Sequence, residues 1–387
     1  MQKNIVYFDN SATTKVEKDV LTVMNQYHEK EYGNPSSLHR MGINAEKAIK
    51  ETRERIGNFL KVTEQTIFFL SGGTEGNNIA IFSSIEKNKH IGKKIVTSKI
   101  EHPSVLEVFK YLQTQGYEVT YLDVDCQGLV DIKHLEGVID NQTSFVSIMK
   151  VNNEIGTVQP LKEISSIVKS ISPQCIVHSD CVQAFGKIPL HPIDEGIDII
   201  TFSAHKFHGP KGVGGMYLNS TLKIKPLIFG GGQEKGLRSG TENVPGIIGM
   251  GKAIELFERD FKSYMDFLYN LKVYTMDSLS KNIEGMTFNS DKLGFAPHIL
   301  NISIENIKGE VLQHMLEDKG VYVSTGSACS SRKKTQSHVL KSIGLDKKSI
   351  DGSLRISFSK FNTFEDIDLM VQALKESVTY LNKYIRR

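Results

Sequence analysis

Short apolar runs alternate with longer amphipathic stretches through the first two thirds of the chain. The runs consist almost wholly of apolar or β-branched residues, as buried parallel strands do. They are Thr66–Leu70, Ile95–Ser98, Glu118–Leu122, Phe145–Met149, Cys175–His178 and Ile199–Phe202. Helical patterns lie between them at Leu38–Leu60, Ser104–Gln115 and Leu161–Ser170. This alternation predicts an α/β domain with a mostly parallel sheet.

The pattern changes after about residue 245. Pro245–Ile283 contains few helix breakers and predicts one long helix. The elements expected after it are a strand at Ile299–Ile304, a helix at Lys308–Lys319, a strand at Leu354–Ser357 and a closing helix from Thr363. We therefore expect a large domain over residues 15–255, and a small α+β domain made of residues 1–14 and 256–387.

One segment has a biased composition. Eleven of the fourteen residues in Ser324–Ser337 are polar, which predicts a mobile loop of the small domain.

Composition narrows the class of protein. The chain has 387 residues, of which 39% are hydrophobic and 24% charged, as in ordinary soluble proteins. Its formal net charge of +3 is too small to indicate a nucleic-acid partner. The first residues lack the pattern of a signal peptide, and every apolar run is too short to span a bilayer. We expect a cytoplasmic protein with no membrane contact.

Polar residues follow five of the predicted strands. Ligands of open α/β sheets bind at the carboxyl ends of the strands, so these residues are expected at one rim. They are Ser71–Glu75, Glu101 with His102, Asn152–Glu154, Asp180 with Gln183, and Ser203–Lys206.

Each of these groups has two interpretations. Gly72-Gly73-Thr74 could receive a phosphate at a helix N-terminus, or form a plain turn with a threonine cap. Asp180 could pair with a protonated ring nitrogen, as pyridoxal chemistry requires, or cap a helix.

Lys206 could be a desolvated amine that attacks a carbonyl, or an ordinary salt-bridged lysine. Lys211, in a glycine-rich turn, is its rival. A metal site made by His178, Asp180, His205 and His208 is a weaker alternative, and we expect no metal.

Cys329 differs from the other three cysteines. It lies in the polar segment near Arg332, Lys333 and Lys334, and positive neighbours favour a reactive thiolate. The alternative is a tolerated surface cysteine. The chain has no Cys-x-x-Cys pair, and we expect Cys126, Cys175 and Cys181 to be structural. Arg355, on a predicted strand, could bind a carboxylate or form a surface salt bridge.

Taken together, the motifs resemble those of the cysteine desulfurases, which are pyridoxal-phosphate enzymes of fold type I related to aminotransferases. The resemblance starts at Tyr7–Thr14 and runs almost to the C-terminus. It includes Tyr32–Ser37, Ser71–Glu75, Glu101-His102, Asn152–Gly156, His178–Asp180, Gln183, Ser203–Lys206, Arg238–Thr241 and Thr325–Cys329. It implies a large domain with a mostly parallel seven-stranded sheet, pyridoxal 5'-phosphate as cofactor, and a homodimer.

The resemblance also implies a role for each site residue. Lys206 resembles the lysine that binds the cofactor as a Schiff base, and His102 the residue that stacks on its ring and relays protons. Asp180 and Gln183 resemble the partners of the ring nitrogen and the ring hydroxyl. The phosphate cradle would be Gly73, Thr74, Ser203 and His205, with Thr241 reaching across the dimer interface. Asn153 and Arg355 would fix the substrate carboxylate.

Cys329 resembles the nucleophile that takes sulfur from L-cysteine, leaving L-alanine and a persulfide. Its Thr-Gly-Ser-Ala-Cys setting is that of the family's first branch. Three features depart from the pattern: the basic Arg332–Lys334, a lysine at position 360 where arginine is common, and an end at Tyr384–Arg387, short of the tail that docks an iron–sulfur scaffold. The acceptor could therefore be a scaffold protein or a thiolation enzyme.

Three other functions stay open at this point. An aminotransferase and a selenocysteine lyase would use the same fold. A non-catalytic interaction protein would not need Lys206, Asp180, His102 and Cys329 together.

Overall fold

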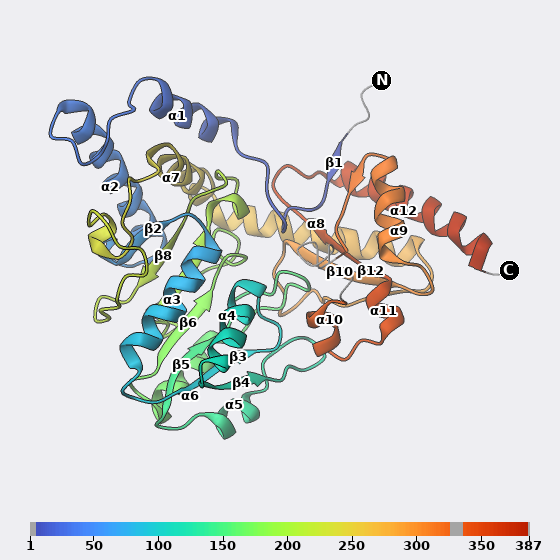
Figure 1. Ribbon diagram of the computed structural model, residues 1–387. Helices are drawn as coiled ribbons and strands as arrows, with labels where there is room; N and C mark the ends of the chain where they lie inside the picture. The colour runs from blue at the N-terminus through green and yellow to red at the C-terminus, as the bar shows by residue number, and fades with distance from the viewer. Residues whose placement is uncertain (1–4, 326–335, 386–387) are drawn as a thin grey trace.

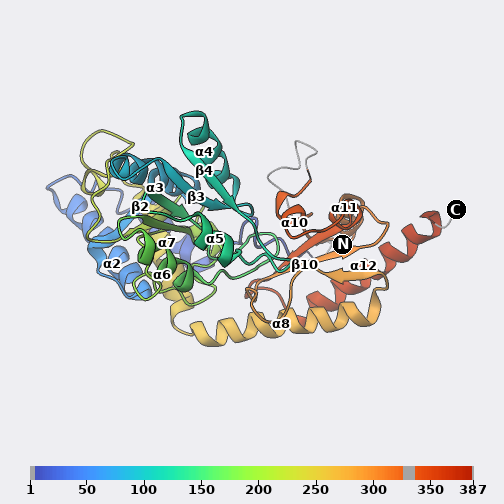
Figure 2. The same ribbon diagram turned by 90° about the horizontal axis from the view of Figure 1, so that it is seen from below.

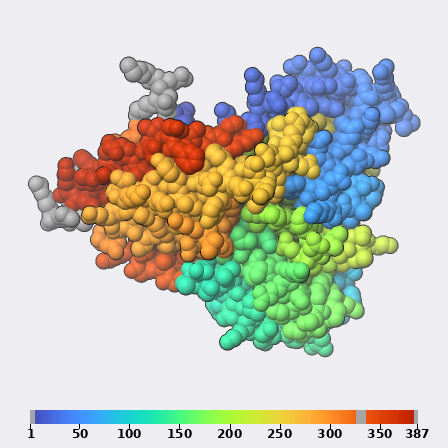
Figure 3. Space-filling view, turned by 180° about the vertical axis from the view of Figure 1, so that it is seen from behind, coloured from blue at the N-terminus to red at the C-terminus, as the bar shows by residue number. Residues whose placement is uncertain are grey.

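The chain folds into a larger and a smaller lobe. The computed structural model describes residues 5–325 and 336–385. The larger lobe surrounds a central sheet, and the smaller one holds the last third of the chain (Figure 1). The helix α8 (Phe261–Asn282) runs beneath both lobes (Figure 2). Seen from behind, it passes without interruption from one to the other (Figure 3).

Seven strands form the central sheet within the described residues. In spatial order they are β2 (Ile67–Leu70), β8 (Gly214–Leu218), β7 (Ile199–Ser203), β6 (Ile176–Asp180), β5 (Thr143–Ser147), β3 (Lys94–Ser98) and β4 (Glu118–Leu122). All pairs are parallel except those that β8 makes with β2 and β7. This confirms the predicted fold class, although β5 lies two residues before its predicted position.

The strand β8 was missing from the prediction because two glycines open it. A Cβ on Gly215 would lie 2.5 Å from the Phe202 ring of the neighbouring strand. Glycine is therefore required there for close packing, even though it usually weakens a strand.

Helices cover both faces of this sheet. They are α1 (Lys18–Glu29), α2 (Arg40–Leu60), α3 (Gly73–Asn88), α4 (Pro103–Thr114), α5 (Ile132–Val138), α6 (Leu161–Ile171) and α7 (Val244–Glu258). Successive strand residues point to opposite faces, so Ile199 packs under α3 and α4 while Ile200 packs with α2, α6 and α7. Apolar residues on both sides explain why these strands read as continuous apolar runs.

The single long helix expected over Pro245–Ile283 is wrong. The chain breaks between α7 and α8 at Asp260, whose backbone has a non-helical φ of −145°. Phe257 and Phe261, on either side of the break, both pack against Phe59. Tertiary packing makes this break with no glycine or proline in the sequence to signal it.

The smaller lobe is built on a three-stranded antiparallel sheet. Its central strand β10 (Ile299–Ile304) lies between β9 (Met286–Phe288) and β12 (Ser353–Ser357). Its helices, besides α8, are α9 (Gly309–Asp318), α10 (His338–Ser342), α11 (Lys347–Asp351) and α12 (Phe364–Ile385). No helix of the described chain is both long and apolar enough to cross a membrane.

The N-terminal segment packs with this lobe. The strand β1 (Val6–Tyr7) pairs in parallel with β11 (Val321–Tyr322), and Val6 and Phe8 enter the same apolar core as α8 and α12. The domain boundaries at residues 15 and 255 stay a prediction. The packing of Val6 and Phe8 favours the first, whereas residue 255 lies inside α7, whose Phe257 packs in the core of the larger lobe.

Candidate active site

A cavity of about 1110 Å³ opens at the carboxyl ends of the central strands, against the smaller lobe. Ten of the predicted site residues line it: Gly73, Thr74, His102, Asn153, Asp180, Gln183, Ser203, His205, Lys206 and Arg355. Thr241 does not. It lines a separate hollow with Arg238 and Glu242. Cys329 lies outside the described residues.

Lys206 follows β7 in a single 3-10 turn, Ala204–Lys206. Its Nζ donates hydrogen bonds to the carbonyl oxygens of Ser11 (2.7 Å) and Ala12 (2.8 Å). These carbonyls keep the amine at the cavity wall. Lys211 is exposed and does not line the cavity, so the structure favours Lys206 over its rival.

The N-terminal segment that holds Lys206 lies between the lobes. The backbone N–H of Ser11 donates to Ser357 Oγ of the smaller lobe at 2.9 Å. The N–H of Thr14 donates to the His205 carbonyl of the larger lobe at 2.9 Å. The first residues of the chain thus fix the position of a lysine almost 200 residues later.

Asp180 ends β6 with its side chain only 5% exposed. Its Oδ1 accepts from the Val182 N–H at 3.0 Å, and its Oδ2 accepts from Asn77 Nδ2 at 2.7 Å. No helix follows in the described chain at this point, so the helix-cap interpretation is wrong. The remaining carboxylate lone pairs can serve a cationic ring nitrogen in the cavity.

His102 caps α4. Its Nδ1 accepts from the Ser104 N–H at 3.1 Å. Burial lowers the pKa of His102; nearby Asp180 opposes this shift and Lys206 adds to it. The neutral ring therefore carries its proton on Nε2, because Nδ1 acts as the acceptor.

The N-terminus of the 16-residue helix α3 lies at the wall of the cavity. Its capping residue is Gly72, with φ of 154° and no side-chain cap, so the threonine-cap interpretation is wrong. A Cβ on Gly73 would lie 2.5 Å from Val182 Cγ2. The uncapped N–H groups and the helix dipole suit a phosphate, and the hydroxyls of Thr74 and Ser203 lie beside them.

His205 also lines the cavity. Burial, reinforced by Lys206, lowers the pKa of His205 to about 4, so its ring is neutral. Its Nδ1 lies 3.1 Å from Thr13 Oγ1.

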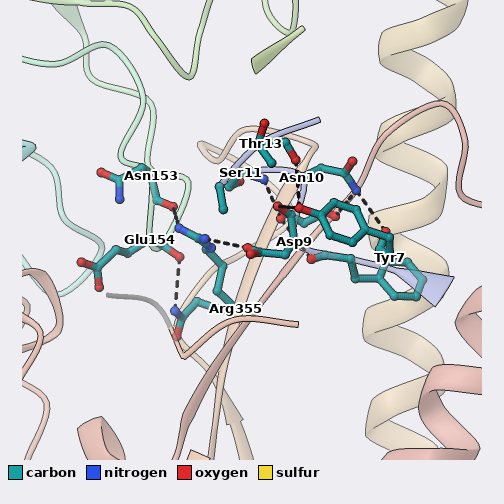
Figure 4. A network of polar contacts seen from close by, with 12 residues as sticks. Tyr7, Asp9, Asn10, Ser11, Thr13, Asn153, Glu154 and Arg355 are labelled. Atoms are coloured by element: carbon teal, nitrogen blue, oxygen red, sulfur yellow. Dashed lines mark hydrogen bonds and ion pairs between the residues drawn. The ribbon is translucent and has the colours of Figure 1, made fainter. Parts of the chain in front are cut away.

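Arg355 projects from β12 of the smaller lobe toward Asp9 and Asn153 (Figure 4), and it lines the cavity. Its Nη2 donates to Asp9 Oδ1 and its Nη1 to the carbonyl of Asn153, both at 2.8 Å. The residue is only 3% exposed, so a surface salt bridge is the wrong description. Burial and Asp9 raise the pKa of Tyr7, which lies next to this ion pair, to about 12.

Gln183 connects the cavity to the interior. Its Nε2 donates to the Ser11 carbonyl at 2.9 Å, and its Oε1 lies 3.4 Å from Nε2 of the fully buried His298. His298 was not found by sequence reasoning, because a histidine before a buried strand carries no distinctive signal.

The remaining candidates lie elsewhere. No group of three or more His, Cys, Asp or Glu side chains in the described chain comes together as a metal site. Cys175 and Cys181 are buried, and burial raises the pKa of the Cys175 thiol to about 12. Cys126 is exposed, and its expected structural role stays a prediction.

Comparison with known proteins agrees with this geometry. A model of the class-V aminotransferases matches residues 6–370. A protein of Methanosarcina thermophila named cysteine desulfurase IscS is 42% identical over 98% of this chain and 93% of its own length. A NifS/IcsS protein homolog of Lactobacillus delbrueckii is 42% identical over 98% of both chains.

Solved structures give the same result. A NifS-like protein superposes with a TM-score of 0.92 and 39% identity, over 97% of this chain and 100% of that one. SspA in complex with cysteine superposes with a TM-score of 0.77 and 32% identity, over 92% and 99% of the two chains. The chain therefore belongs to the class-V aminotransferase family and, within it, to the pyridoxal-phosphate-dependent cysteine desulfurases.

Proposed function

We propose that this enzyme converts L-cysteine to L-alanine and transfers the sulfur atom to Cys329 as a persulfide. The observation that carries the proposal is the convergence of Lys206, Asp180, His102 and Arg355 on one cavity. The segment that contains Cys329 also starts and ends beside this cavity. Ser324 pairs with Arg355 through backbone hydrogen bonds, and Gln336 lines the cavity wall.

The cavity residues fit pyridoxal phosphate. Lys206 would bind its aldehyde carbon, Asp180 its ring nitrogen and Gln183 its ring hydroxyl. The uncapped α3 terminus with Thr74, Ser203 and His205 would hold the phosphate. When bound, this cofactor supplies an electron sink for bond changes at the substrate α-carbon.

The protein side chains perform the other tasks. The Arg355 guanidinium binds the substrate carboxylate, and Asn153 completes that contact. Lys206 moves a proton at Nζ once its amine is released, and neutral His102 exchanges a proton at Nε2. The Cys329 thiolate attacks the substrate sulfur, so that an S–S bond forms and the C–S bond breaks. Overall, cysteine and the enzyme thiol become alanine and the enzyme persulfide.

A second copy of the chain completes the site in this proposal. Thr241 lies outside the main cavity and is exposed, which supports its assignment to the site of another subunit. Tyr32 (68% exposed) and Leu38 (95% exposed), between α1 and α2, and Phe229 (80% exposed), before the Glu234–Gly236 turn, would be covered in a homodimer. The sulfur would then pass to an acceptor protein of the cytoplasm, either an iron–sulfur scaffold or a thiolation enzyme.

The curated relatives are named as desulfurases, which favours this reaction over that of an aminotransferase. SspA was solved with cysteine bound, which supports cysteine as the substrate here.

Two cysteine variants test the proposal. C329S should abolish persulfide formation while the visible absorption of the bound cofactor remains. C126S removes another thiol, one that is exposed, and should leave both unchanged. Persulfide is measured by trapping with an alkylating reagent followed by mass spectrometry. Wild-type rates of alanine and persulfide formation in C329S would refute the assignment.

A further inference from the structure

We propose that Asn77 is a positioning residue that fixes the orientation of Asp180 and the tautomer of His102 at the same time. The inference deepens the proposed function, since it rests on assigning both residues to the cofactor site. Asn77 lies one turn into α3, is fully buried and does not line the cavity. It therefore acts through its neighbours.

The side-chain amide of Asn77 is hydrogen-bonded to three other elements. Its Nδ2 donates to Asp180 Oδ2 at the end of β6 (2.7 Å) and to Ser104 Oγ at the start of α4 (2.8 Å). Its Oδ1 accepts from the hydroxyl of Thr201 in β7. Both amide hydrogens are thus used, each on a different element.

The chemistry of the partners fixes the direction of these bonds. An ionised carboxylate can only accept, so the NH2 end of the amide must face Asp180. The carbonyl end then faces Thr201, whose hydroxyl donates to it. An amide turned the other way would set its oxygen against the carboxylate oxygen, so that two acceptors would face each other with no hydrogen between them.

This direction continues to His102. Ser104 Oγ accepts from Asn77, so its own hydrogen is available for His102 Nδ1, which lies 2.8 Å away. The Ser104 N–H donates to the same nitrogen at 3.1 Å. With two donors directed at Nδ1, the neutral ring carries its proton on Nε2.

Other charged groups also act on this ring. Burial lowers the pKa of His102, and the nearby Lys206 and His338 lower it further, whereas Asp180 raises it. Asn77 adds a geometric constraint to this balance. Asn77 bonds the Asp180 carboxylate directly and reaches the His102 imidazole through Ser104. The two groups are therefore not oriented independently.

The test uses N77L, S104A and a matched control, N78L. Leucine is similar in size to asparagine and removes all three bonds of Asn77. Asn78 is the next residue of the same helix, and its amide donates to the helix carbonyl of Thr74. The readouts are 15N NMR of the His102 imidazole in cofactor-free protein and the affinity of that protein for pyridoxal phosphate.

In N77L we expect the His102 pKa to rise and a tautomer with a proton on Nδ1 to be detected. The affinity for pyridoxal phosphate should fall by roughly tenfold, because Asp180 loses a charge-assisted hydrogen bond. S104A should reproduce the change at His102 with a smaller loss of affinity, and N78L should match the wild type in both measurements.

A wild-type imidazole spectrum in N77L would overturn the proposal. If N77L does not fold, T201V and S104A decide instead, and unchanged His102 spectra in both would overturn it equally. Neither readout requires turnover. A wild-type enzyme that formed no persulfide from cysteine would therefore refute the proposed function and leave this inference standing.

Discussion

Two lysines that follow neighbouring strands of one sheet have opposite environments. Lys206, after β7, lies at the cavity wall and donates to two backbone carbonyls. Lys187, after β6, is 1% exposed, and its Nζ has no hydrogen-bond partner in the described chain. Burial, helped by Lys206 and Arg355, lowers the pKa of Lys187 to about 7.

The comparison shows what makes a lysine functional in this fold. A position after a strand is common to both residues, so it does not separate them. Access to the cavity does, together with acceptors that hold the amine in place. Lys187 meets neither condition, and we expect it to affect the pH dependence of stability instead of chemistry.

The largest effect should come from removing the amine on the cavity side. In K206A, desulfurase activity should fall at least about a thousandfold, because the amine assigned to bind the cofactor aldehyde is lost. The visible absorption typical of the lysine-bound cofactor should disappear as well. Activity assays and absorption spectra of purified protein measure both effects.

K211M is the control for this variant. Lys211 lies five residues further along and is exposed, so its loss should change activity by no more than about twofold. If K211M, and not K206A, lost the cofactor absorption, the assignment of the two lysines would be reversed.

The next effect concerns Arg355, another cation that lines the cavity. In R355K, a single ammonium group replaces a planar guanidinium that contacts both Asp9 and Asn153. We expect KM for cysteine to rise about tenfold to a hundredfold with a smaller change in kcat, because carboxylate binding by two parallel bonds is lost. Steady-state kinetics measure this. A normal KM would show that Arg355 does not bind the substrate carboxylate and has a structural role instead.

Much of this cavity could be predicted from the sequence, because its residues follow buried strands. Asp180 and Lys206 come at or directly after apolar runs, and the carboxyl ends of parallel strands share one edge. The fold class followed from the same runs. Roles such as that of Gln183 rested on the resemblance to a family, and not on any local pattern.

The partners of these residues could not be predicted. Asp9 lies 346 residues before Arg355, and Asn77 lies 103 residues before Asp180. Asn77 looks like any polar residue of a helix until packing places it against β6. The break at Asp260 was missed for the same reason, since tertiary contacts decide it and local propensity does not.

A third prediction concerns the interior lysine. The unfolded chain holds the Lys187 proton up to a pKa of about 10.5, while the native state loses it near pH 7. The unfolded state thus binds more protons between these values, so the free energy of unfolding should rise with pH by up to about 1.4 kcal/mol per pH unit. K187M lacks this contribution.

Urea unfolding at pH 6, 7, 8 and 9 compares the slopes of the wild type, K187M and the control K211M. The slope should be lower in K187M and unchanged in K211M. Equal slopes in wild type and K187M would mean that Lys187 is protonated in the native state, and the contrast with Lys206 would lose its basis. Buried Lys272, whose pKa is also lowered to about 7, should contribute a second, independent part of the slope.

The smallest effect should come from a buried acid, with the opposite sign. Burial raises the pKa of Glu101, the neighbour of His102, to about 8. The native state therefore binds more protons than the unfolded state between about pH 4.5 and 8, and stability from this group falls as pH rises through that window.

The variant E101Q is neutral at every pH and should remove this fall. Its carbonyl can still accept from the Met149 N–H and the Ser98 hydroxyl, as Oε1 does now. Its NH2 group, however, would stand where Oε2 is buried without a partner, which costs about 1–3 kcal/mol. With its pKa raised from 4.5 to about 8, Glu101 costs about 4 kcal/mol at pH 8, so the net gain in E101Q at that pH should be about 1–3 kcal/mol. A loss of stability in E101Q that grew with pH would show that Glu101 is ionised in the native protein.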